Sequence, residues 1–158
     1  MRPGVRLGVD PGRVRIGVAV SDAEGLLAVP LETVRAGSGQ WRRLAELAAE
    51  TAAVEIVVGL PLLLSGGEGR SAHDARDFGG RLAERTGLPV RLVDERLSTV
   101  EASRSLRGAG RSTRSSRTVV DQAAAVVVLQ AALDAERSSG APSGVEVLVP
   151  PRRDEEPT

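Results

Sequence analysis

Acidic side chains close or precede hydrophobic segments at three places in this sequence. Asp10 ends the apolar run VRLGVD, and the adjacent pair Asp94 and Glu95 ends the run LPVRLVDE. Asp121 precedes apolar residues at helical spacings, namely Ala124, Ala125, Val128 and Ala132. A carboxylate is costly to bury unless a cation or hydrogen bonds compensate for its lost hydration. These acids are therefore candidates for a functional site.

Together, the acids would suit a hard divalent cation. If the first and last strands are neighbours in one sheet, their carboxyl ends lie at the same edge, where open α/β sheets place their sites. Clustered carboxylates repel one another and raise each other's pKa unless a cation relieves them. The chain has no Cys and one His, so oxygen ligands and Mg²⁺ or Mn²⁺ are favoured over zinc. Such ions support in-line displacement at a phosphodiester, which predicts nuclease chemistry.

Each acid also has a plain structural interpretation. Asp10 could begin a Pro-Gly turn, Asp94 or Glu95 could pair with Arg96, and Asp121 could complement the dipole of its helix. Successive strand residues point to opposite faces of a sheet. Only one of Asp94 and Glu95 can therefore address a metal, and the strand pattern leaves the choice between them open.

The basic residues are predicted to bind phosphate only where they cluster. The 158 residues carry 21 basic and 21 acidic side chains, so the formal net charge is zero and indicates no partner. Segment 103–117 contains five arginines and no acid, which favours an arm that binds nucleic-acid phosphates over a solvated loop. The candidate contacts are Arg107, Arg111, Arg114 and Arg117. The glycine-rich stretch 59–69 could likewise present backbone N–H groups to a phosphate, or merely form a loop.

Periodicity predicts the elements that position these residues. Strands are expected in 5–10, 15–22, 26–34, 54–61 and 88–95, and helices in 39–53, 71–87, 98–106 and 117–137. Short links make the first three strands antiparallel, and helical crossovers make the last pair parallel. The fold class is therefore α/β, with a five-stranded mixed sheet flanked by helices. Residues 1–137 are expected to form one domain and residues 138–158 a disordered tail.

Composition narrows the functional classes further. The absence of Cys excludes disulfide frameworks and thiolate catalysis. No apolar run reaches the roughly 20 residues of a membrane span, and no signal sequence opens the chain, so a soluble cytoplasmic protein is expected. With one Trp, one Phe and no Tyr, modules that stack several bases on aromatic platforms are disfavoured.

Four segments resemble the signatures of the YqgF family, also called RuvX, in order and spacing. They are GVDPGRVRIGVAVSD, VVGLPLLLSG, VDERLST and SSRTVVDQAAAVVVLQAAL, and the match spans about residues 5–133. The resemblance implies a ribonuclease H-like fold and a nuclease of Holliday junctions or of pre-16S ribosomal RNA. It also implies that Asp10, Glu95 and Asp121 are the catalytic, metal-binding acids. Arg13 and Arg117 stand where relatives often have other polar residues or Lys.

Two other functions compete with a metal-dependent nuclease as explanations of these motifs. Actin-like ATPases and sugar kinases also begin with Asp-x-Gly after a first strand, but they need two such domains, which this chain is too short to supply. A non-catalytic nucleic-acid-binding module with a relic active site is the alternative, and retention of all three acids argues against it. The sequence leaves open RNA or DNA as substrate, one or two metal ions, and a monomer or homodimer.

Overall fold

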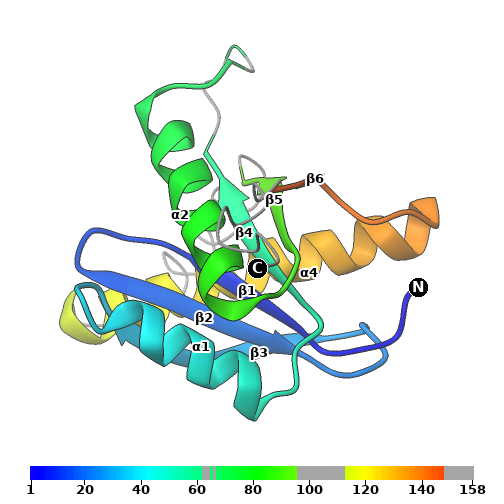
Figure 1. Cartoon of the computed structure of the whole chain (residues 1–158), viewed down its shortest axis with the longest axis horizontal. Helices are drawn as coiled ribbons and strands as arrows, with labels where there is room; N and C mark the ends of the chain where they lie inside the picture. The colour runs from blue at the N-terminus through cyan, green and yellow to red at the C-terminus, as the bar shows by residue number, and fades with distance from the viewer. Residues whose placement is uncertain (62–64, 66, 96–112, 148–158) are drawn as a thin grey trace, which may run out of the picture.

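A single mixed sheet, drawn in Figure 1, organises the protein. The computed structural model describes residues 1–61, 65, 67–95 and 113–147, with side chains in the last range described from Gln122 onward. The described strands are β1 (Arg6–Asp10), β2 (Arg15–Ser21), β3 (Ala28–Arg35), β4 (Glu55–Leu60), β5 (Val90–Asp94) and β6 (Val145–Glu146). The described helices are α1 (Gln40–Glu50), α2 (Arg70–Thr86) and α4 (Thr113–Ser139). The helix predicted at 98–106 lies outside the described residues.

The sheet has the strand order β3-β2-β1-β4-β5-β6. As predicted, β1, β2 and β3 are antiparallel neighbours, and β4 and β5 are parallel to each other. Strand β4 also pairs parallel with β1, so it lies between β1 and β5, and the first and last of the predicted strands are not direct neighbours. The predicted count of five strands is wrong, because β6 adds a sixth by pairing antiparallel with β5. This short strand lies in the segment expected to be a tail. Disorder of the tail stays a prediction for residues 148–158, which are outside the description.

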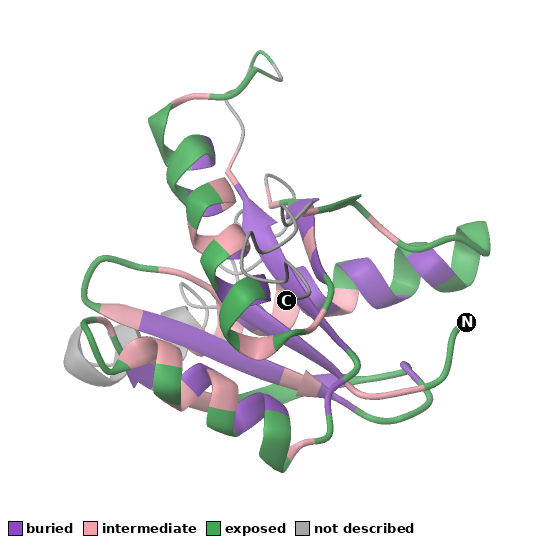
Figure 2. Ribbon diagram, in the orientation of Figure 1, coloured by how far each residue is buried: buried purple, intermediate pink, exposed green. Residues whose placement is uncertain are grey.

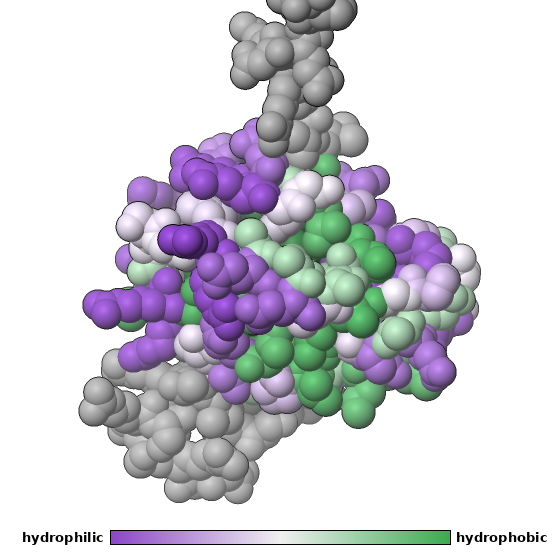
Figure 3. Space-filling model, turned by 60° about the horizontal axis from the view of Figure 1, so that its bottom comes forward, coloured by the Kyte–Doolittle hydropathy of each residue, from purple (hydrophilic) through white to green (hydrophobic). Residues whose placement is uncertain are grey.

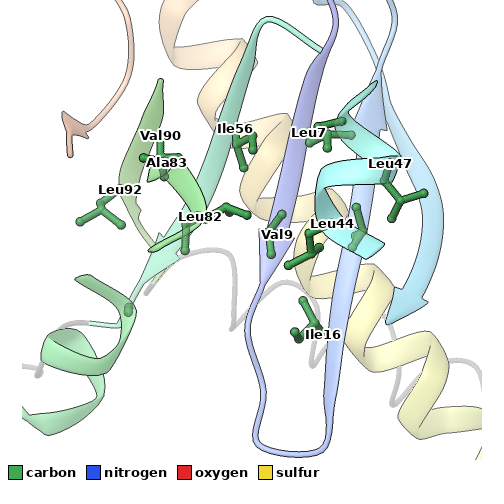
Figure 4. Close-up of a cluster of buried hydrophobic side chains, with 14 of the residues drawn as sticks. Leu7, Val9, Ile16, Leu44, Leu47, Ile56, Leu82, Ala83, Val90 and Leu92 are labelled. Carbon is green, nitrogen blue, oxygen red and sulfur yellow. The ribbon is translucent and has the colours of Figure 1, made fainter. Parts of the chain in front are cut away.

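Helices cover both faces of the sheet. In Figure 1, α1 and α2 lie in front of the sheet and α4 lies behind it. Two buried apolar clusters correspond to these layers. The larger, shown in Figure 4, joins α1 and α2 to the sheet through side chains such as Leu44, Leu82 and Val9. The smaller joins α4 to the other face, and Figure 2 shows that the central strands are buried between the two layers.

The described helices form where the helical spacing of apolar residues predicted them. On α1, Leu44, Leu47 and Ala48 are buried as one stripe, and α2 ends at Gly87, whose φ of 70° suits glycine. On α4 the predicted stripe is confirmed at Ala125, Val128 and Ala132, which are buried, while Ala124 is half-buried. Among the described helices, none combines the length and hydrophobicity that crossing a membrane requires.

The edge strand β3 carries exposed apolar side chains. Figure 3 shows hydrophobic residues gathered on the face at the bottom of Figure 1, where β3 borders the sheet. The exposed apolar residues of β3 and the preceding turn include Leu26, Leu27, Val29 and Leu31. Pro30 lacks an N–H group, and the register with β2 shifts beside it. Both features oppose the addition of another strand at this edge.

An ionic cluster of the exposed Arg2 with the buried Arg6, Glu55 and Glu136 holds the C-terminal half of α4 against the start of β1. Nε of Arg2 donates a hydrogen bond of 2.6 Å to Glu136, and Nη1 of Arg2 donates one of 3.0 Å to Glu55. The guanidinium of Arg6, almost fully buried, lies 3.8 Å from Glu136. The hydrogen bond from Arg2 is the main reason that the pKa of Glu136 is lowered. Because the C-terminal end of α4 lies beside the start of β1, the N-terminal half of the helix lies toward the end of that strand.

Candidate active site

A cavity of about 420 Å³ opens at the carboxyl ends of the central strands. Asp10 at the end of β1, Gly59 of β4 and Glu95 just after β5 line it. The turn after β1 and the face of α2 complete the wall, with Pro11, Gly12, Arg13, Pro61, Ser71, Asp74, Ala75 and Phe78. The structure therefore brings two of the three predicted acids, Asp10 and Glu95, to one cavity.

Strand alternation places both acids on the side of the sheet that α4 covers. A Cβ on Gly8 would lie 2.7 Å from Cβ of Leu129, so Gly8 faces α4, and Asp10 follows it by two residues. On β5, Val93 belongs to the cluster packed on α4, and Glu95 follows it by two residues. This shared face explains why two residues far apart in the sequence line the same cavity.

Gly59 permits the side chain of Glu95 to enter the cavity. A Cβ at Gly59 would lie 2.5 Å from Oε2 of Glu95, closer than side chains approach one another. The backbone N–H of Glu95 donates a hydrogen bond of 3.2 Å to the carbonyl oxygen of Leu60, which holds the chain beside β4. Asp94 is exposed and is absent from the residues that line the cavity. Of these two acids, Glu95 lines the cavity and Asp94 does not, and the role of Glu95 as a metal ligand stays a prediction.

The environment of Glu95 disfavours its charged form. Burial raises the pKa of this carboxyl group, and the negative charge of Asp94 raises it further. A bound cation would reverse both effects by stabilising the carboxylate. A half-buried carboxyl group beside a second acid, with its pKa raised, is a recurring property of functional sites.

Asp121, the third predicted acid, belongs to α4 and precedes Ala125 by one helical turn. The carbonyl oxygen of Ala125 would lie 2.9 Å from a Cβ on Gly8, so this part of the helix packs directly on β1. The side chain of Asp121 is outside the described part of the structure, and its role stays a prediction. Among the side chains that are described, no group of three or more acids and histidines is close enough to hold a metal ion.

The predicted arginine arm falls mostly outside the description. Arg107 and Arg111 lie in residues that the structure does not describe, and Arg114 and Arg117 belong to α4 without described side chains. The glycine-rich stretch 59–69 is described only in part. Phosphate binding by these segments stays a prediction.

Sequence reasoning missed the contribution of α2 to the cavity. Ser71, Asp74, Ala75 and Phe78 follow the spacing i, i+3, i+4 and i+7, which places them on one helical face. The sequence predicted a helix over 71–87, but helical periodicity does not distinguish side chains of a core from those of a cavity wall. Arg13 also lines the cavity, although the sequence marked it only as a departure from the family pattern.

Comparison with known proteins identifies the family. The model of the family described as "RuvX: Holliday junction resolvase" matches residues 4–135. The chain belongs to the RuvX family. Among its RuvX relatives, the "Putative pre-16S rRNA nuclease" of Clavibacter sepedonicus is 54% identical, over 97% of this chain and 96% of the relative. The protein of the same name from Leifsonia xyli subsp. xyli is 56% identical, over 91% and 94% of the two chains.

The fold of this RuvX chain is ribonuclease H-like, as predicted. Its structure is similar to that of "T. thermophilus RuvC in complex with Holliday junction substrate", with a TM-score of 0.55. The similarity covers 87% of this chain and 98% of RuvC at 18% sequence identity, so it concerns the fold. The family resemblance read from the four sequence segments is confirmed, and with it membership in a family of nucleases.

Proposed function

We propose that this protein is a divalent-metal-dependent nuclease that hydrolyses phosphodiester bonds in structured nucleic acid. The observation that carries the proposal is the placement of Asp10 and Glu95, at the ends of separate strands, on one cavity and on one side of the sheet. Membership in the RuvX family and the names of its relatives support the same activity. The proposed substrates are the precursor of 16S ribosomal RNA and four-way DNA junctions.

The side chains present fit Mg²⁺ or Mn²⁺. Asp10 and Glu95 supply carboxylate oxygens, and Asp121 is the proposed third ligand. The raised pKa of Glu95 is consistent with a site that needs a cation to hold its carboxylates together. When bound, one or two such ions would lower the pKa of the attacking water and stabilise the leaving oxygen.

The protein contributes position and surroundings to this chemistry. Gly59 leaves room for the Glu95 carboxylate beside β4, and the packing of α4 on Gly8 fixes the layer behind β1. The half-buried position of Asp10 and Glu95 limits competing water around both carboxylates. Preorganised groups in such a partly desolvated site act more strongly than they would in bulk water.

Cleavage of two substrates side by side tests the proposal. A fragment of pre-16S ribosomal RNA and a four-way DNA junction would be incubated with the protein and Mg²⁺ or Mn²⁺, with Asp10→Asn as the control. The substitution keeps the size of the side chain but removes a charged ligand, so cleavage should be lost while the thermal unfolding curve still shows a folded protein. Equal turnover by both proteins would refute the catalytic assignment. Tight binding without cleavage of either substrate would instead favour the non-catalytic binding module.

The arginine arm is the proposed means of holding the substrate backbone. If Arg107, Arg111 and Arg114 each contact a phosphate, replacing all three with Ala should flatten the log–log dependence of affinity on salt by roughly two to three units on duplex DNA. Binding to all sequences should weaken alike. Anisotropy titrations with Ca²⁺ at several salt concentrations measure the slope. An unaltered slope of log affinity against log salt concentration would exclude these phosphate contacts. Replacing Arg117 with Ala tests its predicted contact in the same way.

A further inference from the structure

The wall of the cavity opposite the carboxylates has a different chemistry from the rest of the site. The face of α2 presents the aromatic ring of Phe78, the methyl group of Ala75, the hydroxyl of Ser71 and the carboxylate of Asp74. We call these four residues the α2 wall. A phosphodiester group held by metal ions between Asp10 and Glu95 needs none of them, so the α2 wall requires a separate explanation.

Phosphate is a poor match for the α2 wall. The carboxylate of Asp74 repels a phosphate oxygen, and the ring of Phe78 offers it no hydrogen bond. Asp74 accepts no hydrogen bond from the residues that the structure describes, whereas its helix neighbours Arg76 and Asp77 pair with Glu68 and His73. Among the residues that the structure describes, the carboxylate of Asp74 is therefore an available acceptor at the cavity, beside a half-buried aromatic ring.

A nucleobase matches this combination. It is flat and apolar on its faces, which suits stacking on Phe78, and it carries N–H donors at its edge, which suit the carboxylate of Asp74. The ring of Trp41 lies 5.0 Å from that of Phe78 and supports it from α1. The cavity volume of about 420 Å³ is in the range of small-molecule sites.

We propose that the α2 wall is a subsite for one unpaired nucleobase next to the phosphodiester that is cut. The base stacks on Phe78 and donates an N–H hydrogen bond to Asp74, with Ser71 as a further polar contact. This proposal rests on the proposed nuclease function and specifies its substrate. The nucleic acid presents an unpaired nucleotide beside the cleavage position, because a base within a duplex cannot leave the stack without a cost of a few kcal/mol.

Binding measurements without turnover test the subsite. The Asp10→Asn full-length protein with Ca²⁺ would be titrated by fluorescence anisotropy against a labelled hairpin with a short single-stranded extension, made once as RNA and once as DNA. In each probe, one extension base at a time is replaced with an abasic site. At one position the loss of the base should weaken binding by about 5- to 150-fold, the range expected for stacking of a base on an aromatic ring.

Variants of Phe78 separate stacking from packing. Phe78→Leu keeps an apolar side chain in the helix and should remove the penalty of the abasic site, whereas Phe78→Tyr keeps the ring and should retain it. If Phe78→Leu still discriminates against the abasic probe as the parent does, the stacking proposal is wrong. Thermal unfolding of both variants confirms that the comparison is made on folded protein.

Variants of Asp74 test the edge contact, and Asp77 provides the matched control. Probes with guanine or hypoxanthine at the sensitive position differ by one amino group. Asp74→Ala removes the acceptor and should abolish the preference between the bases, while Asp77→Ala, on the same helix but outside the cavity, should keep it. Equal binding of all extension probes by the parent would refute the subsite alone. Absence of binding to every probe would refute the proposed function as well.

Discussion

Substitution of Gly59 with Ala tests the placement of Glu95 without removing the carboxylate. The added Cβ would lie 2.5 Å from Oε2 of Glu95 and 3.4 Å from Cγ2 of Val128. Restoring ordinary contact requires the carboxylate to move by about 1 Å, because non-bonded atoms prefer roughly 3.5 Å or more. A displacement of about 1 Å from a reacting geometry can cost roughly 100-fold in rate. We therefore expect the rate of cleavage by Gly59→Ala to fall by about 100-fold.

Stability should change little in this variant. The nearest atom is the end of a flexible side chain, and replacing Gly with Ala reduces the entropy of the unfolded chain by an equivalent of about 0.4–1 kcal/mol. Cleavage rates at saturating Mg²⁺ and urea unfolding curves measure the two effects. Gly80→Ala is the control, because nothing lies within 4 Å of its added Cβ and Ala favours a helix. Full activity of Gly59→Ala would show that the position of Glu95 does not matter for cleavage.

Two further predictions concern stability. Because its pKa is raised in the folded state, ionised Glu95 opposes folding, and its contribution to stability falls as pH rises from the unfolded-state pKa through the folded one. Glu95→Gln should accordingly raise the melting temperature near pH 7, measured with a metal chelator present. This gain should vanish below about pH 4, where Glu95 is protonated in both states. An equal gain at both pH values would contradict a raised pKa of Glu95 in the folded protein. Gly8→Ala should lower the free energy of unfolding by about 1–3 kcal/mol, because its Cβ would lie 2.7 Å from Leu129 and 2.9 Å from the backbone oxygen of Ala125. Urea unfolding measures this effect, and an unchanged midpoint would mean that α4 is free to shift.

The order of the main strands and helices could be predicted from the sequence because local residue patterns specify each of them. Apolar runs bounded by Pro and Gly predicted the first three strands, and helical periodicity predicted α1, α2 and the buried stripe of α4. The end of α2 is also specified locally, because Gly87 readily adopts the left-handed backbone conformation found there. The acids at the strand ends were conspicuous because a charge at the end of an apolar run breaks the hydrophobic pattern. Four motifs in register sufficed to predict the family, which the comparisons confirm.

The sixth strand could not be predicted from its own residues. Val145 and Glu146 are too few to show an alternating pattern. They form a strand because the edge of β5 is available beside them. The N–H of Val147 donates a hydrogen bond of 2.8 Å to the carbonyl oxygen of Val90, and Arg91 donates side-chain hydrogen bonds to the backbone just before the strand. Its formation depends on a partner more than fifty residues earlier in the chain.

The sequence by itself determined which chemical groups are available, namely carboxylates at the ends of strands, a basic segment and an amphipathic α2. Only the tertiary structure decided which of those groups share a cavity. Alternation along β5 leaves Asp94 and Glu95 equivalent until α4 covers one face of the sheet, and Gly59 then leaves the space that Glu95 occupies. In the same way, the sequence of α2 places Ala75 and Phe78 on one helical face but does not say what that face contacts. This face borders a cavity because the neighbouring strands end there. Periodicity is a property of one segment, whereas a site is made by packing between segments that are distant in sequence.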